Sequence, residues 1–176
     1  MANSIDLRTL ITNEANAQGV PPAMALAVAQ TESGMSQWTP AGSVVTSSAG
    51  AKGVFQLMPS SFPGQDVTDL NTNISLGIGY LKQLFNQYGN WNQALAAYNW
   101  GPTNVNNSSS IPSSVAAYVS KILGLNTIFS GSSSSSGISA PTITADSLLG
   151  GLDTSNTTLW ALGILAGVVA IAWVLD

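Results

Sequence analysis

The segment that most constrains the fold is residues 23–34, an apolar run closed by a single acid. Its first seven residues are all Ala, Met, Leu or Val. Pro21 and Pro22 precede it and predict the start of a helix, because proline is tolerated in the first helical turn. A helix with no polar face has to lie at the centre of a domain. Gly34 predicts its end and so places Glu32 in the last turn.

Four further helices are predicted from capping residues and from apolar residues at 3.6-residue spacing. They cover residues 5–18, 71–88, 90–100 and 112–123, with caps at Asn3 or Ser4, Asn71 or Thr72, and Asn90, and with stops at Gly19, Gly89, Gly101 and Gly124. Residues 34–52 and 60–69 are predicted loops, and a loop as long as the first is often functional. No segment before residue 130 alternates as a strand does. The sequence therefore predicts a single, mainly α domain within residues 1–129.

A Ser/Gly-rich tract marks the end of this domain. Residues 130–137 contain only Ser and Gly, a composition that buries nothing and behaves as a flexible coil. We therefore predict a linker over residues 130–156. The N-terminus lacks a basic region followed by an apolar run, so no secretory signal is predicted.

The end of the chain has the pattern of a membrane anchor. Residues 157–175 carry no charge and predict one transmembrane helix about 28 Å long, with a buried core helix as the alternative. Trp160 and Trp173 stand near its two ends, where indole rings prefer the membrane interface. Gly163 and Gly167 form a GxxxG pattern that allows self-association. No Lys or Arg flanks the segment, so its orientation is not predicted.

Composition removes several classes of function. The chain has no His and no Cys, which excludes Ser-His-Asp and Cys-His nucleophiles, the usual zinc ligand sets and disulfides. We therefore expect no metal and no cofactor. Its four Lys and Arg residues are scattered and do not form the basic patch that nucleic acid requires. Asn, Gln, Ser, Thr and aromatic residues are plentiful, which permits a carbohydrate site.

Glu32 is the candidate general acid. A carboxylic acid donates a proton near neutral pH only if its pKa is raised, and burial among apolar groups does this by penalising the charged form. The partial negative charge at the C-terminal end of a helix acts in the same direction. The alternative is a solvated residue at a helix end, with no catalytic role.

Four short motifs follow one another in order along the chain. They are Glu32-Ser33, residues 47–59 (SSAGAKGVFQLMP), residues 73–81 (NISLGIGYL) and residues 96–102 (AAYNWGP), with a weaker fifth at residues 118–122 (YVSKI). Together they resemble the motifs of the lytic transglycosylases of the soluble-lytic-transglycosylase type, which have a goose-type-lysozyme-like fold. The resemblance runs from about Ile5 to Leu123.

This resemblance implies a lyase that cleaves the β-1,4 bond between N-acetylmuramic acid and N-acetylglucosamine in peptidoglycan. Glu32 would protonate the leaving oxygen and then act as base on the muramic acid 6-hydroxyl, which closes a 1,6-anhydro ring. One carboxylate suffices for that chemistry, whereas ordinary glycosidases use two. A hydrolytic muramidase is the alternative if Asp66 or Asp69 folds back towards Glu32.

The resemblance also implies a set of substrate-binding residues: Ser33, Ser47, Gln56, Tyr98, Asn99 and Tyr118. Several have structural alternatives. Gln56 would either bind an acetamido group or form hydrogen bonds with the loop backbone. Tyr98 would bond to Glu32, orient the sugar, or pack in the core. Ser33 would either contact substrate or form a local hydrogen bond at the end of its helix. Asn99 is expected to hold a turn as well. Trp100 replaces a small residue of the family motif, so its indole either blocks a subsite or adds a stacking platform.

These features favour a peptidoglycan lytic transglycosylase with a membrane anchor. A catalytic domain on a Ser/Gly tether with a C-terminal anchor suits a virion protein of a tailless bacteriophage with an internal membrane, where it would open the host cell wall during genome entry. A bacterial envelope protein is the alternative location. The alternative function is a virion protein that binds peptidoglycan or remodels membranes without cutting glycan.

Overall fold

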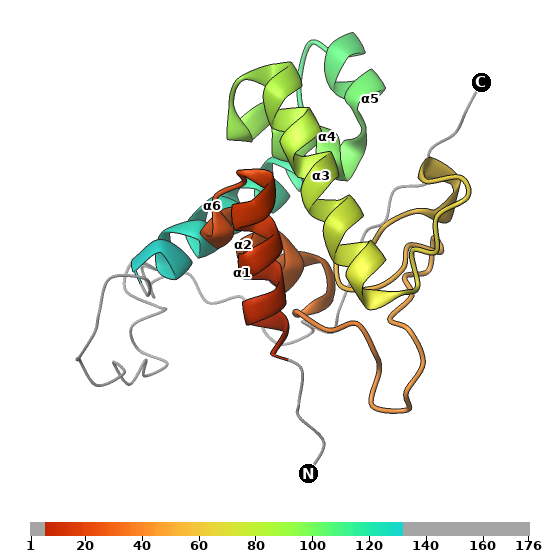
Figure 1. Cartoon of the computed structure of the whole chain (residues 1–176). Coiled ribbons are helices and arrows are strands. Elements are labelled where there is room, and N and C mark those ends of the chain that lie inside the picture. The colour runs from red at the N-terminus through yellow and green to blue at the C-terminus, as the bar shows by residue number, and fades with distance from the viewer. Residues whose placement is uncertain (1–5, 132–176) are drawn as a thin grey trace, which may run out of the picture.

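The computed structural model describes residues 6–131 and confirms a mainly α domain (Figure 1). Its elements are α1 (Leu7–Gln18), α2 (Pro22–Ser33), the short 3-10 helix η1 (Pro59–Ser61), α3 (Leu70–Tyr88), α4 (Trp91–Trp100), α5 (Pro102–Asn107) and α6 (Ser113–Gly131). Isolated β-bridges, such as Trp38 with Val44 and Lys52 with Leu57, order the long segment between α2 and α3.

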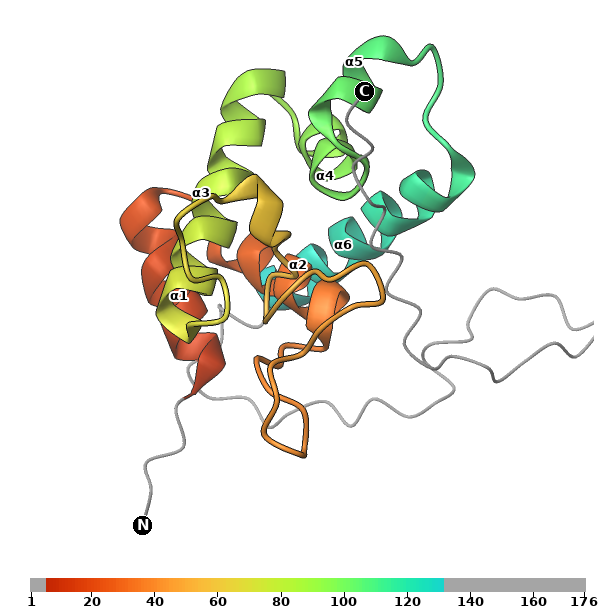
Figure 2. The same ribbon diagram turned by 90° about the vertical axis from the view of Figure 1, so that its right-hand side faces the viewer.

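The apolar helix α2 is central, as its sequence predicts. Ala27, Val28 and Ala29 have no exposed surface, because α2 packs against α6 and against α1. A second layer is made by α3, which packs against α4 and α1. Figure 2 shows α2 in the middle of the molecule, with the loops of residues 34–69 passing the end of the helix that carries Glu32.

Two helices begin at acidic caps that differ from the predicted caps. Asp6 caps α1 by accepting from the Arg8 amide at 3.1 Å, so the predicted caps at residues 3 and 4 are wrong. Asp69 caps α3 by accepting from the Thr72 amide at 2.9 Å, so the caps predicted at residues 71 and 72 are wrong as well. In both cases Asp is as good a cap as Ser or Asn, and in α3 the earlier start also buries Leu70.

The predicted stop at Gly124 is also wrong, because α6 continues through it to Gly131. Glycine costs only about 1 kcal/mol inside a helix, and packing beyond it offsets that cost. Phe129 is buried, and the Arg8 guanidinium lies 5.0 Å from its ring centroid. The helix thus extends two residues past the predicted domain boundary. The short helix α5 was not predicted.

The predicted linker from residue 132 onward and the predicted membrane helix, with Gly163 and Gly167, lie outside the described residues. Within residues 6–131, no helix has the length and apolar character needed to cross a bilayer.

Candidate active site

Glu32 lies in the last turn of α2 and is almost fully enclosed, with 8% of its surface exposed. The Tyr118 hydroxyl on α6 donates to its Oε1 at 2.5 Å, across a separation of 86 residues. Burial raises the pKa of Glu32 to about 7, while the Tyr118 hydrogen bond and the positive charge of Lys121 oppose that rise. A carboxyl group with such a pKa can give a proton and take one back near neutral pH.

Two tyrosines border the acid and both remain neutral. Burial raises the pKa of Tyr118 and of Tyr98 well above the ordinary value, and the nearby Glu32 charge adds to the effect. Tyr118 holds Glu32, whereas Tyr98 on α4 donates to the Phe55 carbonyl at 2.8 Å. Tyr98 therefore has the structural role that was its alternative: it packs against the core, and its hydroxyl bonds to the turn that carries Gln56 and not to Glu32.

Gln56 presents an unpartnered acceptor beside a small cavity. It has a φ of 47°, and its Nε2 donates to the Gly53 carbonyl at 2.7 Å and to the Val45 carbonyl at 3.3 Å. Its Oε1 is buried and has no hydrogen-bond partner within residues 6–131. A cavity of about 50 Å³ adjoins Gln56 and Tyr98; Leu57, Met58, Ser61, Phe62 and Tyr80 complete its lining. The site can therefore accept one N–H next to a small apolar group.

Two fully buried amides, missed as site residues by the sequence analysis, hold the turn before Gln56. The Gln37 Oε1 accepts from the Val54 amide at 2.8 Å, and the Asn73 Oδ1 accepts from the Phe55 amide at 2.9 Å. A Cβ at Gly53 would lie 2.5 Å from the Gln37 Oε1, so glycine is required there. Asn73 stands in a recognised motif that signalled its importance, whereas Gln37 has no sequence signal because its partners are distant in the chain.

The two predicted serines bond to backbone groups. The Ser33 hydroxyl donates to the Val54 carbonyl at 2.9 Å and to the Ala29 carbonyl at 3.2 Å, and accepts from the Ser36 amide at 3.0 Å. Ser33 thus has the helix-end role that was its alternative, and it ties α2 to the turn at Val54. The Ser47 Oγ accepts from the Ala51 amide at 3.0 Å. Substrate contacts by either serine stay predictions.

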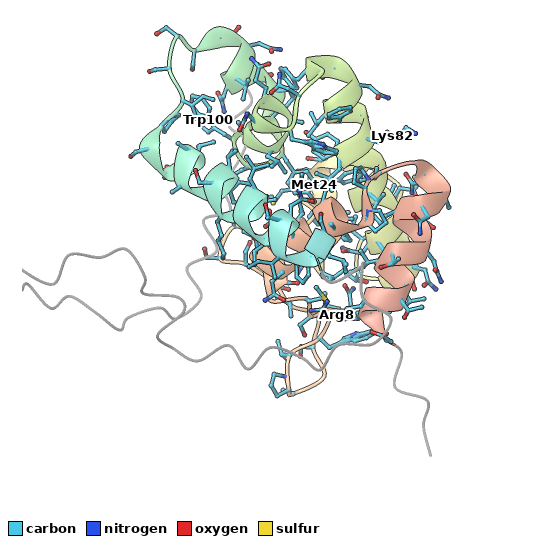
Figure 3. All side chains as sticks on the ribbon, turned by 90° about the vertical axis from the view of Figure 1, so that its left-hand side faces the viewer. Arg8, Met24, Lys82 and Trp100 are labelled. Carbon is cyan, nitrogen blue, oxygen red and sulfur yellow. The ribbon has the colours of Figure 1, made fainter. Side chains whose placement is uncertain are left out.

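Asn99 and Trp100 lie at the end of α4 and are both half-buried. The Trp100 indole packs against the main hydrophobic core (Figure 3), and the Trp100 carbonyl accepts from the Asn104 side chain at 2.6 Å. A role for either residue in substrate binding remains a prediction.

The loop acids serve as turn and helix caps. Asp66 accepts from the Thr68 hydroxyl at 2.5 Å and from the Thr68 amide at 2.9 Å, and Asp69 caps α3. These hydrogen bonds lower the pKa of both carboxyls. Neither acid is among the groups that act on the pKa of Glu32. The part of the chain that the structure describes also has no cluster of three or more acidic residues able to hold a metal ion.

The family is decided by a match over the residues that build this site. The family model described as "Transglycosylase SLT domain" matches residues 9–119, which include Glu32, Gln56, Tyr98 and Tyr118. The chain belongs to this family. The membership predicted from the ordered motifs is thereby confirmed.

Individual relatives of the SLT domain are much longer proteins. The soluble lytic murein transglycosylase of Escherichia coli K12 is 37% identical over 102 residues, covering 49% of this chain and 15% of that protein. The Salmonella typhimurium protein of the same name is 34% identical over 112 residues, covering 54% of this chain and 16% of that protein. The chain therefore spans about a sixth of the length of these relatives.

Solved structures agree with the SLT fold. The 70 kDa soluble lytic transglycosylase of E. coli superposes with a TM-score of 0.60 at 30% identity, covering 72% of this chain and 24% of that chain. An inactive mutant of the lytic transglycosylase Slt of Pseudomonas aeruginosa superposes with the same TM-score at 24% identity, covering 71% of this chain and 24% of that chain. The second likeness supports the fold alone.

Proposed function

We propose that this SLT domain is a peptidoglycan lytic transglycosylase in which Glu32 is the single acid and base. The observation that carries the proposal is the enclosure of Glu32, whose pKa is raised to about 7 by burial and whose Oε1 accepts from Tyr118. A group poised in this way is suited to proton transfer in both directions. The names of the relatives, soluble lytic murein transglycosylases, support the same chemistry.

The reaction needs one carboxyl group. Protonated Glu32 donates to the glycosidic oxygen as the bond from that oxygen to C1 of N-acetylmuramic acid breaks. The 6-hydroxyl of the same sugar then attacks C1, and the Glu32 carboxylate takes its proton, which leaves a 1,6-anhydro ring and a free 4-hydroxyl on N-acetylglucosamine. The neutral Tyr118 hydroxyl stabilises the carboxylate between the two steps. The engagement of Asp66 and Asp69 as caps favours this route over a mechanism with paired carboxylates.

Gln56 supplies the recognition of an acetamido group. Its unpartnered Oε1 would accept the acetamido N–H, and the acetamido methyl would enter the adjoining cavity of about 50 Å³. A buried acceptor left without a donor is costly, so a sugar with a donor at that carbon is preferred to one without. An acetamido group is preferred to a hydroxyl there because only the acetamido group also carries a methyl that fills the cavity.

Product analysis tests the proposal. The full-length protein is incubated with purified peptidoglycan, and the soluble products are analysed by mass spectrometry. Products lighter by one water than the reducing muropeptides are expected, and Glu32→Gln should abolish them while still unfolding in a cooperative thermal transition. Reducing-end products would establish a hydrolytic muramidase instead. Unchanged activity in the variant would remove Glu32 from its role, and binding without any cleavage would favour a non-catalytic wall-binding protein.

We further propose that residues 157–175 anchor the enzyme in a bilayer and that the protein belongs to a bacteriophage particle with an internal membrane. The support is the uncharged apolar sequence of that segment, bounded by Trp160 and Trp173. There it would open the host wall during genome entry. Detection in purified particles tests this placement, whereas presence only in host membranes would favour the bacterial envelope.

A further inference from the structure

A second and larger cavity, of about 300 Å³, lies away from the Gln56 cavity on another face of α3. Tyr80 lines the Gln56 cavity and Lys82 lines the larger one. Two residues turn a helix by about 200°, so these side chains leave α3 in nearly opposite directions. The walls of the larger cavity are the turn between α1 and α2 at Gly19, one face of α3, and the start of α4 at Trp91.

One wall of this cavity is aromatic. The rings of Phe85 and Trp91 lie 4.4 Å apart between centroids, at 32° to one another, and both side chains are half-buried. Asn86, which is exposed, adds an amide at the rim. Such a wall covers aliphatic or C–H-rich groups, and the amide can orient a polar one.

Lys82, labelled in Figure 3, contributes a positive charge to the lining of the cavity. Its ammonium donates to the Gln18 carbonyl at the end of α1, and a Cβ added at Gly19 would lie 3.0 Å from its Nζ. The ammonium is therefore held where Gly19 lines the cavity. An ammonium has three donors, and no carboxylate within residues 6–131 pairs with Lys82. The nearby acid Glu14 is already engaged, since its Oε1 accepts from the Gln18 side chain and from Ser75.

We propose that this cavity binds a peptide carboxylate and that, if the proposed function holds, its ligand is the stem peptide of peptidoglycan. A single ammonium with unused donors matches one carboxylate, which forms a stronger hydrogen bond than a neutral acceptor does. The Phe85–Trp91 wall covers the alanyl methyl groups of such a peptide. A volume of about 300 Å³ is at the small end for ligand pockets and suits one or two residues. The cavity thus holds a wall strand by its peptide at a distance from the Glu32 site.

The test uses a ligand without sugar. Full-length, 15N-labelled Glu32→Gln protein is titrated with the tetrapeptide L-Ala–D-Glu–diaminopimelate–D-Ala, and with the same peptide carrying amides in place of its carboxyl groups. The free acid should shift the Trp91 indole N–H resonance, and the amidated peptide should not. Lys82→Gln should weaken binding about tenfold or more, because a charged hydrogen bond is lost.

Matched charge variants keep the test independent of folding. Asn86→Asp adds a negative charge at the exposed rim of the cavity and should also weaken binding. Gln83→Glu adds the same charge at an exposed position of α3 that does not line the cavity, and should leave binding within about twofold, as expected of screened surface charges. Equal effects of the two variants would overturn the proposal.

Three further results would overturn it: no shift of Trp91, equal binding of the amidated peptide, or displacement of the peptide by inorganic phosphate at equal concentration. The two proposals fail separately. Peptide binding without wall cleavage would contradict only the proposed transglycosylase, and wall cleavage without peptide binding would contradict only the carboxylate site.

Discussion

At the scale of single residues, Glu32 and Tyr118 show what a sequence reveals and what it hides. The enclosure of Glu32 follows from the residues around it, since Ala23 to Ala29 leave α2 no polar face. Its partner does not follow, because the contact depends on how α6 crosses α2, 86 residues later in the chain. Tyr118 belongs to the weakest motif, yet it is the tyrosine that holds the acid.

The raised pKa of Glu32 predicts a pH-dependent stability. The group has an ordinary pKa of 4.5 in the unfolded chain and about 7 in the fold, so between these values only the folded state keeps the proton. The contribution of Glu32 to the free energy of unfolding is fully present below pH 4.5, and it decreases as the pH rises to about 7. The total fall is about 3 kcal/mol. Urea unfolding of the full-length protein at pH 5 and pH 8 should show this fall, and Glu32→Gln should lack it. Parallel pH profiles of the two proteins would contradict the assignment.

We expect removal of the Tyr118 hydroxyl to move the alkaline limb of the pH–rate profile to higher pH. The hydrogen bond from Tyr118 lowers the pKa of Glu32, so Tyr118→Phe should raise it by about one unit. Because the first step needs protonated Glu32, the alkaline limb of the pH–rate profile should move upward by a similar amount. Tyr98→Phe is the control, since that hydroxyl donates to the Phe55 carbonyl. A shift of equal size in both variants would mean that the hydrogen bond to Glu32 is not the cause.

At the scale of elements, the helices were predictable and the connections were not. Gly19, Gly34 and Gly89 end helices as predicted, each with a positive φ, because glycine adopts this conformation without strain. Gly124 failed as a stop because the packing of Phe129 keeps α6 going, and packing does not appear in a local signal. The conformation of residues 34–69 escaped prediction for a similar reason, since it rests on hydrogen bonds between residues far apart in the chain.

Gly77 on α3 packs tightly against Phe55, so a single added methyl group should disturb the turn that carries Gln56. A Cβ at Gly77 would lie 2.4 Å from the Phe55 Cγ, so Gly77→Ala should push Phe55 and its turn away from α3. Overpacking of this kind costs about 1–3 kcal/mol, and activity should fall further than stability because Gln56 moves too. Gly79→Ala is the matched control on the same helix. Its Cβ would meet the Gln18 Oε1 at 3.2 Å, a side-chain end that can move, and alanine favours the helix by about 1 kcal/mol. Urea unfolding and peptidoglycan digestion of both variants separate the two effects.

At the scale of the whole molecule, the chain consists of an SLT domain, which also occurs in much longer relatives, followed by a C-terminal sequence outside the family match. The match to the family ends at residue 119, and the relatives are covered over only 15–16% of their length. The tract of Ser and Gly from residue 130 and the apolar segment after it lie beyond that match. A means of fixing the proposed enzyme to a membrane, in contrast, is to be sought in the residues beyond the family match.

Vesicle flotation tests whether residues 157–175 attach the protein to a bilayer. The full-length protein should float with neutral phospholipid vesicles, because nineteen uncharged residues from 157 to 175 are long enough to span the hydrocarbon core. The double variant Leu165→Asp and Val168→Asp should stay with the unbound protein, since each acid at the centre of a spanning helix costs about 2.5–3.5 kcal/mol. Leu152→Asp, in the predicted linker, is the matched control and should float like the unmodified protein.

Digestion of soluble peptidoglycan fragments should be equal in all three proteins if the segment only places the enzyme. A loss of digestion in the double variant alone would instead make the segment part of the active assembly, and flotation of the double variant would contradict the anchor.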